Sequence, residues 1–228
     1  MPADAQPHEA QADLWVLSLE GEVDLRQATQ LGLDASELQR ASRLVFADRR
    51  ARFIRGCALR RQVLARYLGL APAALRFVRG DHGKPALWGG DGPHFNVSHS
   101  GALMLMVVAS GTEVGVDVEP LRALPDAALL RDRYFHPDER EQAGDGDAGL
   151  LMLWTCKEAA VKAMGAGISA GWDHVRLRQV QTGRGRAEVA GQACHLHVLA
   201  PAPGHVAAVA SLGQPLRLCV RDERIESL

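Results

Sequence analysis

Residues Leu150–Met164, LLMLWTCKEAAVKAM, form the clearest predicted helix in the chain. Apolar side chains fill most of this stretch, so little of the helix surface is left for solvent. The glycine at Gly165 is expected to end the helix. The same stretch contains Lys157 and Lys162, two of only three lysines in a chain with 23 arginines. Lysine in so apolar a helix indicates a role other than surface charge.

Two successive blocks of helices and strands are expected around this helix. The first block is predicted to begin with a strand over Leu14–Gly21, followed by a helix within residues 31–46 capped by Asp34 or Ser36 and a helix over 49–68 that ends at Gly69. Short strands are expected within 75–87. Residues 95–111 are expected to form a loop that enters a buried strand, and residues 112–120 to be the antiparallel or neighbouring partner of that strand. The second block is predicted to hold a helical region within 126–142, interrupted near His136–Pro137, and short strands over 174–180, 187–191, 194–200, 205–211 and 216–221. This order predicts an α+β fold of two lobes.

Composition and charge narrow the classes of protein. The chain has 228 residues, 47% hydrophobic and 23% charged, which is ordinary for a folded protein and long enough for two lobes. A formal net charge of -1 gives no support for nucleic-acid or membrane binding. No signal peptide or membrane-spanning run is visible, so a cytoplasmic location is expected. The four cysteines form no CxxC pair, so neither a zinc site nor a disulfide framework is predicted.

The segment GVDVEP, residues 115–120, carries two carboxylates that an extended strand would direct to one face, Asp117 and Glu119. Two such groups repel each other unless a cation lies between them. Oxygen ligands without nearby Cys or His favour Mg²⁺, or Mn²⁺, over zinc. An exposed strand end beside Pro120 is the alternative, and it is the commoner meaning of an isolated pair of this kind.

Glu158 and Lys162 lie four residues apart, on one face of the apolar helix. A surface salt bridge, contributing about 0.3–0.5 kcal/mol, is the simple interpretation. The apolar surroundings favour another one, in which Glu158 is a third carboxylate beside Asp117 and Glu119. Mg²⁺ would then have an incomplete protein shell with positions left for water and phosphate. The ammonium groups of Lys157 and Lys162 would act on the phosphates as compact point charges.

Other polar residues carry weaker indications. Lys84 lies in GDHGKP, which lacks the spacing of a phosphate-binding P-loop, and a solvated turn lysine is the commoner case. A catalytic pair of Ser98 and His99 is not favoured, because neighbours in a strand point apart and no third acid follows; both could donate to a phosphate. His195 and His197 are expected on ordinary sheet surface. Residues 40–66 contain nine arginines and only one acidic residue. A solvent-exposed, arginine-rich helix face explains this composition as well as a binding role does.

Taken in order, the segments GKP, FNVSHS, GVDVE and WTCKEAAVK resemble the 4'-phosphopantetheinyl transferases, of the larger pseudo-dimeric surfactin synthetase activator type. The resemblance runs from about Leu14 to Ser211. The two signature motifs of the family, GxD and W-[STC]-x-K-E-A-x-x-K, match without a gap at Gly115–Asp117 and Trp154–Lys162. Together they are far more specific than either motif alone.

The resemblance implies an enzyme that transfers the 4'-phosphopantetheine arm of coenzyme A to a serine of an apo acyl or peptidyl carrier protein, with release of 3',5'-ADP. It implies magnesium held by Asp117, Glu119 and Glu158, with manganese as a substitute. Glu158 is expected to accept the serine proton, directly or through water. Lys162 and Lys157 are expected to be catalytic, and Lys162 to contact the coenzyme A pyrophosphate.

The coenzyme A contacts implied by the resemblance are Arg40, Arg52, Lys84, Ser98, His99 and Lys162. The chain departs from the family at Glu37, where relatives can carry a lysine near the 3'-phosphate. This departure assigns more of the 3'-phosphate binding to Arg40 or Arg43.

The fold implied is two similar α/β lobes related by a pseudo-two-fold axis, with the active site in the cleft between them. Residues 1–13 are expected to be disordered, residues 14–112 to form the N-terminal lobe, and residues 113–228 to form the C-terminal lobe with both signature motifs. A monomer is expected, because the second lobe supplies what a partner subunit would.

Two other functions fit parts of the pattern. A metal-dependent nucleotide or pyrophosphate hydrolase could use the same carboxylates, but no second water-activating group is evident. An inactive carrier-protein-binding module could keep the fold, although the charged motif residues are all present. The sequence does not identify the carrier protein among those for fatty acids, polyketides, nonribosomal peptides or siderophores.

Overall fold

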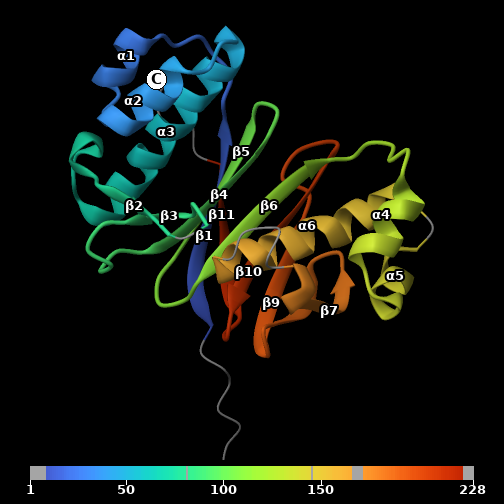
Figure 1. The fold of residues 1–228 in the computed structure, drawn as a ribbon. Coiled ribbons are helices and arrows are strands. Elements are labelled where there is room, and N and C mark those ends of the chain that lie inside the picture. The colour runs from blue at the N-terminus through green and yellow to red at the C-terminus, as the bar shows by residue number, and fades with distance from the viewer. Residues whose placement is uncertain (1–8, 81, 145, 166–171, 223–228) are drawn as a thin grey trace, which may run out of the picture.

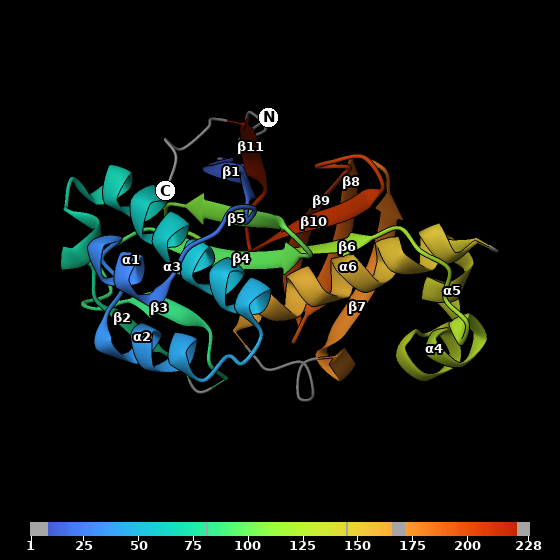
Figure 2. The same cartoon turned by 90° about the horizontal axis from the view of Figure 1, so that it is seen from above.

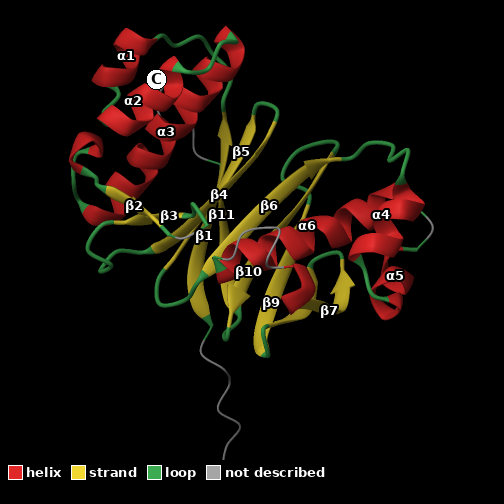
Figure 3. Cartoon of the chain, viewed as in Figure 1, coloured by secondary structure: helices red, strands yellow, loops and turns green. Residues whose placement is uncertain are grey.

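Two sheets lie side by side in the computed structural model of the chain, which describes residues 9–80, 82–144, 146–165 and 172–222 (Figure 1). The first sheet has the strand order β11 (Leu216–Arg221), β1 (Ala10–Ser18), β5 (Leu103–Ala109), β4 (His94–Ser100). The second has the order β6 (Val114–Pro120), β10 (His205–Leu212), β9 (Gln192–Leu199), β8 (Arg184–Val189), β7 (Val175–Gln181). A small hairpin pairs β2 (Phe77–Arg79) with β3 (Pro85–Leu87). The chain is therefore a mixed α+β protein (Figure 3).

In the view from above, α1 (Leu25–Gln30), α2 (Ala35–Ser42) and α3 (Ala47–Leu68) lie toward one end of the molecule, and α4 (Ala127–Tyr134) and α5 (Pro137–Ala143) lie at the other (Figure 2). The helix α6 (Asp147–Met164) runs alongside β6, from the middle of the molecule toward α4 and α5. Single 3₁₀ turns occur at Pro72–Ala74 and Trp172–His174. The buried side of α3 packs on the first sheet and α6 packs on the second, so each sheet has its own helix-covered core.

Helix α6 is buried on nearly all sides, as its apolar sequence predicts. It begins at Asp147, three residues before the expected start, and ends at Gly165. That glycine has φ 76° and donates its N–H to the carbonyls of Val161 and Lys162. Only a residue without a side chain adopts this left-handed conformation at little cost, so Gly165 fixes the end of the helix. The same geometry ends α3 at Gly69, also as predicted.

A shared apolar core and one buried amide join the two sheets where β4 lies beside β6. Side chains of both sheets form one cluster, in which Leu105 and Val107 of β5 meet Val114 and Val116 of β6. The Asn96 side chain on β4 is only 5% exposed and accepts the backbone N–H of Val116 at 3.0 Å. A side-chain amide thus satisfies a buried backbone donor at the edge of β6. The junction places the residues of β4 next to those of β6.

The strand pairing corrects one expectation. The segment at 112–120 was expected to be an antiparallel or neighbouring partner of the strand before it. β6 shares an apolar cluster with β5, as a neighbour does, but its hydrogen-bonded partner is β10, in a register that sets Asp117 opposite Ala208. β5 pairs instead with β1 and β4, and the predicted loop at 95–100 is itself strand β4. The turn between β5 and β6 contains Gly111 at φ 76°, where the chain leaves the first sheet for the second.

The two ends of the described chain lie together in the first sheet. β1 starts at Ala10, four residues before the expected strand, so residues 10–13 are ordered as part of it; residues 1–8 lie outside the described chain. β11 pairs in parallel with β1, although its residues follow the second sheet in sequence. Arg221 on β11 donates to Asp13 on β1 at 3.0 Å. The C-terminal strand therefore ties the second half of the chain to the first.

Candidate active site at the junction of the sheets

Three polar side chains from three elements meet at the junction: Ser98 on β4, Asp117 on β6 and Lys162 on α6. The Lys162 Nζ lies 2.6 Å from the Asp117 Oδ1. The Ser98 hydroxyl donates to the same oxygen at 2.9 Å and accepts from Lys162 at 3.1 Å. Asp117 is only 5% exposed. The structure thus brings together three residues that sequence motifs had indicated separately.

Gly115, the first residue of the GxD motif, makes this meeting possible. A Cβ atom at this position would lie 2.1 Å from the carbonyl oxygen of Ala159 and 2.4 Å from the amide nitrogen of Ala163. Both atoms belong to the backbone of α6 and cannot move aside on their own. Glycine therefore lets α6 approach β6 closely enough for Lys162 to reach Asp117, which lies two residues further along the strand.

Two more carboxylates lie in the electrostatic field of Asp117. Burial, and then the charge of Asp117, raise the pKa of Glu158 above its ordinary value. The same two causes, in the same order, raise the pKa of Glu119. Glu158 is 5% exposed, and one of its oxygens accepts the indole N–H of Trp172 at 3.2 Å. The charge of Asp117 thus disfavours the ionised form of both glutamates.

The residues at this junction fit a divalent cation with a partial protein shell. Asp117 Oδ2 is buried and has no hydrogen-bond partner, although such an atom is normally paired. The donors are all carboxylate oxygens, which suit Mg²⁺ or Mn²⁺. Among the described residues, no three His, Cys, Asp or Glu side chains are grouped so that together they could hold a metal ion. Magnesium commonly binds through one or two carboxylates with water and substrate phosphates, so it needs no closed cage.

Lys157 lies apart from this group, although it belongs to the same motif. Its ammonium group forms an ion pair with Glu139 at 2.9 Å and donates to the carbonyl of Tyr134 at 2.9 Å. The side chain is 2% exposed and that of Glu139 is fully buried. This differs from the expectation that Lys157 and Lys162 both act on phosphates. The reason is geometric: Lys157 and Lys162 are five residues apart, which at 3.6 residues per turn directs them about 140° away from each other around the helix.

Lys84 contacts the backbone of β6 and α6. Its ammonium group forms an ion pair with Glu113 at 2.8 Å and donates to the carbonyls of Val114 and Ala163 at 3.2 and 3.3 Å. The Ala163 carbonyl belongs to the last turn of α6, where a positive charge is favourable. Lys84 thus links the loop between β2 and β3 to β6 and α6, beside a separate cavity of about 380 Å³.

A cavity of about 540 Å³ lies next to the junction, between α2, α3 and β4. Three of the predicted coenzyme A contacts line it: Arg40, Arg52 and His99. His99 directly follows Ser98, and the two side chains point to opposite faces of β4, as expected for neighbours in a strand. β4 therefore connects the cavity to the carboxylates. Sequence composition indicated the Arg-rich segment, but not that Arg49, Arg60 and Arg79 would also line the cavity.

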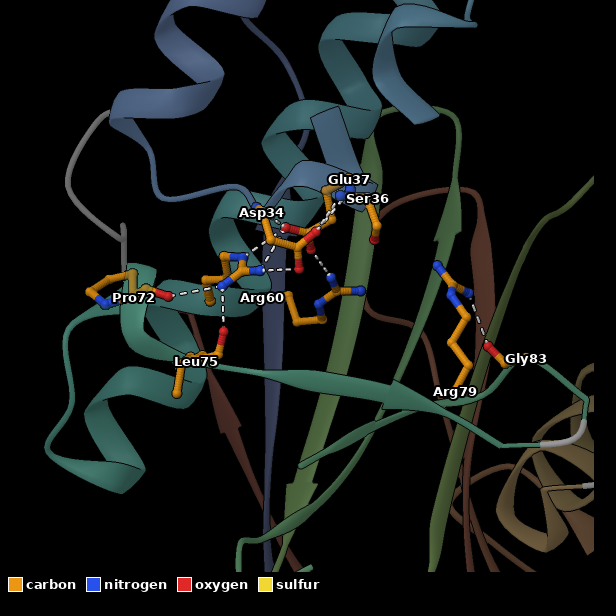
Figure 4. A network of polar contacts seen from close by, with 9 residues as sticks. Asp34, Ser36, Glu37, Arg60, Pro72, Leu75, Arg79 and Gly83 are labelled. Atoms are coloured by element: carbon orange, nitrogen blue, oxygen red, sulfur yellow. Dashed lines mark hydrogen bonds and ion pairs between the residues drawn. The ribbon is translucent and has the colours of Figure 1, made fainter. Parts of the chain in front are cut away.

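The negative charge of Glu37 is balanced by arginines of the same chain. Its carboxylate forms ion pairs with Arg60 and, at 2.7 Å, with the fully buried Arg61, as Figure 4 shows in part. Glu37 also accepts the N–H of Asp34, while the Asp34 side chain caps α2 in return. The capping box and the two ion pairs give the acid at position 37 a structural role. Arg40 and Arg43 were expected to contribute more to binding of the 3'-phosphate, and of these two Arg40 lines the cavity.

The remaining candidates keep structural roles. His195 and His197 lie on β9, and His197 Nε2 is 3.0 Å from the Leu216 carbonyl oxygen of β11. Burial lowers the pKa of both imidazoles. Cys57, Cys156, Cys194 and Cys219 are all free thiols. In the described part of the chain, no helix is long and apolar enough to cross a bilayer.

Comparison with known proteins identifies relatives over most of the chain. Residues 113–210 match the family described as the 4'-phosphopantetheinyl transferase superfamily, and residues 22–112 match the one described as 4'-phosphopantetheinyl transferase, N-terminal. The chain is 35% identical over 208 residues to the 4'-phosphopantetheinyl transferase HetI of Nostoc sp. strain PCC 7120, covering 88% of this chain and 87% of HetI.

Two further relatives agree with this result. The putative 4'-phosphopantetheinyl transferase slr0495 of Synechocystis sp. strain PCC 6803 is 36% identical over 150 residues, covering 63% of this chain and 61% of its own. The 4'-phosphopantetheinyl transferase Sfp of Bacillus subtilis strain 168 is 29% identical over 165 residues, covering 69% and 72%. Each is a protein to which this chain is similar.

Proposed function

The chain belongs to the 4'-phosphopantetheinyl transferase superfamily, and from this premise we propose that it transfers the phosphopantetheine arm of coenzyme A to a serine of an apo acyl or peptidyl carrier protein. The proposed reaction depends on magnesium and releases 3',5'-ADP. The observation that carries the proposal is the meeting of Ser98, Asp117 and Lys162 beside a cavity lined with arginines.

The cavity between α2, α3 and β4 is the proposed site for the nucleotide of coenzyme A. Its volume of about 540 Å³ lies within the ordinary range for small-molecule sites. Arg40 and Arg52 would bind phosphate groups, for which a planar, permanently charged guanidinium is well suited. His99 and Ser98 follow one another on β4, so together they would guide the pyrophosphate from the cavity to the carboxylates.

Asp117, Glu119 and Glu158 are the residues that would hold magnesium. When bound, magnesium would neutralise charge on the pyrophosphate and orient it. Support comes from the unpaired Asp117 oxygen and from the two neighbouring carboxyls whose pKa values are raised.

The remaining steps belong to side chains. The serine oxygen of the carrier forms a bond to the phosphorus that bears the pantetheine arm, and the bond from that phosphorus to the oxygen of 3',5'-ADP breaks. Glu158 is the proposed acceptor of the serine proton, directly or through a water molecule. Lys162 would stabilise the negative charge that develops on the leaving group.

We also propose the finer features of the assembly. Residues 14–112 and 113–228 would correspond to two lobes related by a pseudo-two-fold axis, with β11 of the second segment returned to the first sheet and the coenzyme A pyrophosphate at the junction between the lobes. The two family matches support this division, because one ends at residue 112 and the other begins at 113. A monomer in the cytoplasm is the proposed working state.

The test is to incubate the protein with coenzyme A, magnesium and an apo carrier protein, and then to measure the mass of the carrier. A gain of one phosphopantetheine, with loss of the gain in Asp117→Asn, is the expected result. Release of 3',5'-ADP without carrier modification would indicate a hydrolase instead. If neither the modified carrier nor 3',5'-ADP is formed, the result would indicate a binding module. A panel of apo carriers from different pathways would then identify the physiological acceptor class.

A further inference from the structure

Trp172 contacts Glu158 from a part of the chain that lies outside both signature motifs. Its indole N–H donates to Glu158 Oε1 at 3.2 Å, and the residue is 8% exposed. It lies in the single 3₁₀ turn before β7, beyond the end of α6. A buried indole usually has a hydrogen-bond partner, and here that partner is the proposed base.

Aromatic neighbours fix the orientation of the Trp172 ring. Its centroid lies 4.6 Å from that of Trp154, 5.2 Å from Tyr134 and 5.9 Å from Phe135. These separations are typical of aromatic pairs that contribute packing energy beyond their buried area. A ring held by three others has little freedom to turn, so its N–H keeps pointing at Glu158.

The buried ion pair of Lys157 supports the same ring. The Lys157 Nζ lies 5.6 Å from the Trp172 ring centroid and 5.1 Å from that of Phe135. Glu139, which pairs with Lys157, also accepts the backbone N–H of Leu177 on β7 at 2.7 Å. A cation within about 6 Å of an aromatic face is attracted to it. Lys157 and Glu158 are neighbours in sequence, and both contact Trp172.

We propose that Trp172 is a positioning residue for Glu158, and that the Lys157–Glu139 pair holds Trp172 in place. The inference rests on the proposed function, in which Glu158 serves the metal and the carrier serine. Without a donor, the Glu158 carboxylate would be free to rotate away from Asp117, because the two groups carry like charges. The indole N–H engages Oε1 and thereby opposes that rotation. The arrangement also gives Lys157 a role that requires no contact with phosphate.

The first test compares Trp172→Phe with Trp154→Phe in the presence of coenzyme A, with Mn²⁺ affinity measured by calorimetry. Both variants lose part of the same aromatic cluster, but only Trp172 donates to Glu158 among the described residues. Trp172→Phe is expected to bind Mn²⁺ about tenfold more weakly, since hydrogen bonds to charged groups are the stronger ones. Trp154→Phe keeps an aromatic ring beside Trp172 and removes no donor to Glu158, so its loss of Mn²⁺ affinity is expected to be clearly smaller than that of Trp172→Phe. Equal losses in the two variants, or none in Trp172→Phe, would overturn the proposal.

The second test uses the wild-type protein, so it holds even if Trp172→Phe does not fold. The indole N–H resonances are assigned by substituting Trp15, Trp88 and Trp154 one at a time, which identifies that of Trp172 by elimination, and Mg²⁺ is then added with coenzyme A bound. The Trp172 resonance is expected to shift more than those of Trp15 and Trp88. A Trp172 resonance that does not move at saturating Mg²⁺ would overturn the inference.

The two tests separate this inference from the proposed function. If the wild-type protein modifies a carrier while Trp172→Phe keeps wild-type Mn²⁺ affinity, the positioning role is wrong and the proposed function stands. If the wild-type protein neither binds Mn²⁺ nor modifies a carrier, both are wrong.

Discussion

Lys157 and Lys162 lie on one helix, and the structure gives their ammonium groups different partners. Lys162 faces the junction of the sheets, where Asp117 Oδ1 lies 2.6 Å away. Lys157 is buried against Glu139. Burial lowers the pKa of Lys157, and the hydrogen bond and charge of Glu139 oppose that shift. At the scale of single residues, one lysine is placed for chemistry and the other for structure.

Replacing each lysine by alanine separates these roles. Lys157→Ala leaves the fully buried Glu139 without its cation, which should cost about 3–5 kcal/mol of unfolding free energy. Lys162→Ala should slow carrier modification about a hundredfold or more, with a smaller change in stability. Urea denaturation and the transfer rate are the two measurements. A stable Lys157→Ala protein together with an unfolded Lys162→Ala protein would contradict the assignment.

At the scale of elements, the packing of α6 on β6 sets the geometry of the site. The close approach depends on Gly115, whose missing side chain is replaced by the backbone of α6. Caps also define the helices, since α2 begins at a reciprocal pair formed by Asp34 and Glu37. A single substitution at Gly115 or at Asp34 therefore tests each feature separately.

Gly115→Ala is expected to destabilise the protein by about 3 kcal/mol or more, because the added methyl group overlaps backbone atoms of α6. Gly146→Ala is the matched control, since a Cβ there meets no atom within 4 Å. Thermal unfolding of both variants is the measurement. Equal unfolding midpoints would show that α6 does not need this close contact.

The Asp34 cap predicts a pH-dependent stability. Burial would raise the pKa of Asp34, but hydrogen bonds from Glu37 and Ser36 and the charge of Arg61 lower it below 3.8 overall. A depressed folded-state pKa contributes stability above the unfolded value, and that contribution disappears as the pH falls through the folded value. Asp34→Asn should therefore cost about 1 kcal/mol at pH 7. The difference from wild type should shrink as the pH falls below 3.8. A pH-independent difference would contradict it.

Elements with strong local patterns were predictable, and their partners in the sheets were not. The expected helix over 49–68 and its stop at Gly69 are confirmed, as is the interruption of the helical region near His136–Pro137. The pairing of β6 with β10 was not foreseen, because it joins segments separated by most of the second half of the chain. Nothing local marks Asn96 as the residue that satisfies the edge of β6.

At the scale of the whole molecule, one chain supplies both sheets, the junction between them and the cavity beside it. β11 returns to the first sheet and pairs with β1, so the second half of the chain is held to the first at two places. The residues that meet at the junction come from β4, β6 and α6 of the same chain. No second copy is required to complete the site.

The protein is therefore expected to be a monomer of 24.6 kDa in solution. Light scattering coupled to size exclusion, across a range of concentrations and with coenzyme A added, measures this mass directly. A mass of twice that value at micromolar concentration would contradict the prediction.

The site could be predicted from sequence only where a motif carries the residue. Asp117, Ser98 and Lys162 belong to such motifs and meet in the structure. The ion pair of Lys157 with Glu139 and the contact of Trp172 with Glu158 depend on how α5, α6 and the start of β7 pack together. The spacing of residues along the chain does not predict how these elements pack.

The central claim is that Asp117, Glu119 and Glu158 share one divalent ion. Crystals of the protein with coenzyme A and Mn²⁺, measured at the manganese absorption edge, test it most directly. One anomalous peak is expected, within about 2.5 Å of oxygen atoms of these carboxylates and of oxygen atoms of the coenzyme A pyrophosphate. A manganese ion bound elsewhere, or a Glu158 carboxylate too far from Asp117 for one ion to contact both, would contradict it.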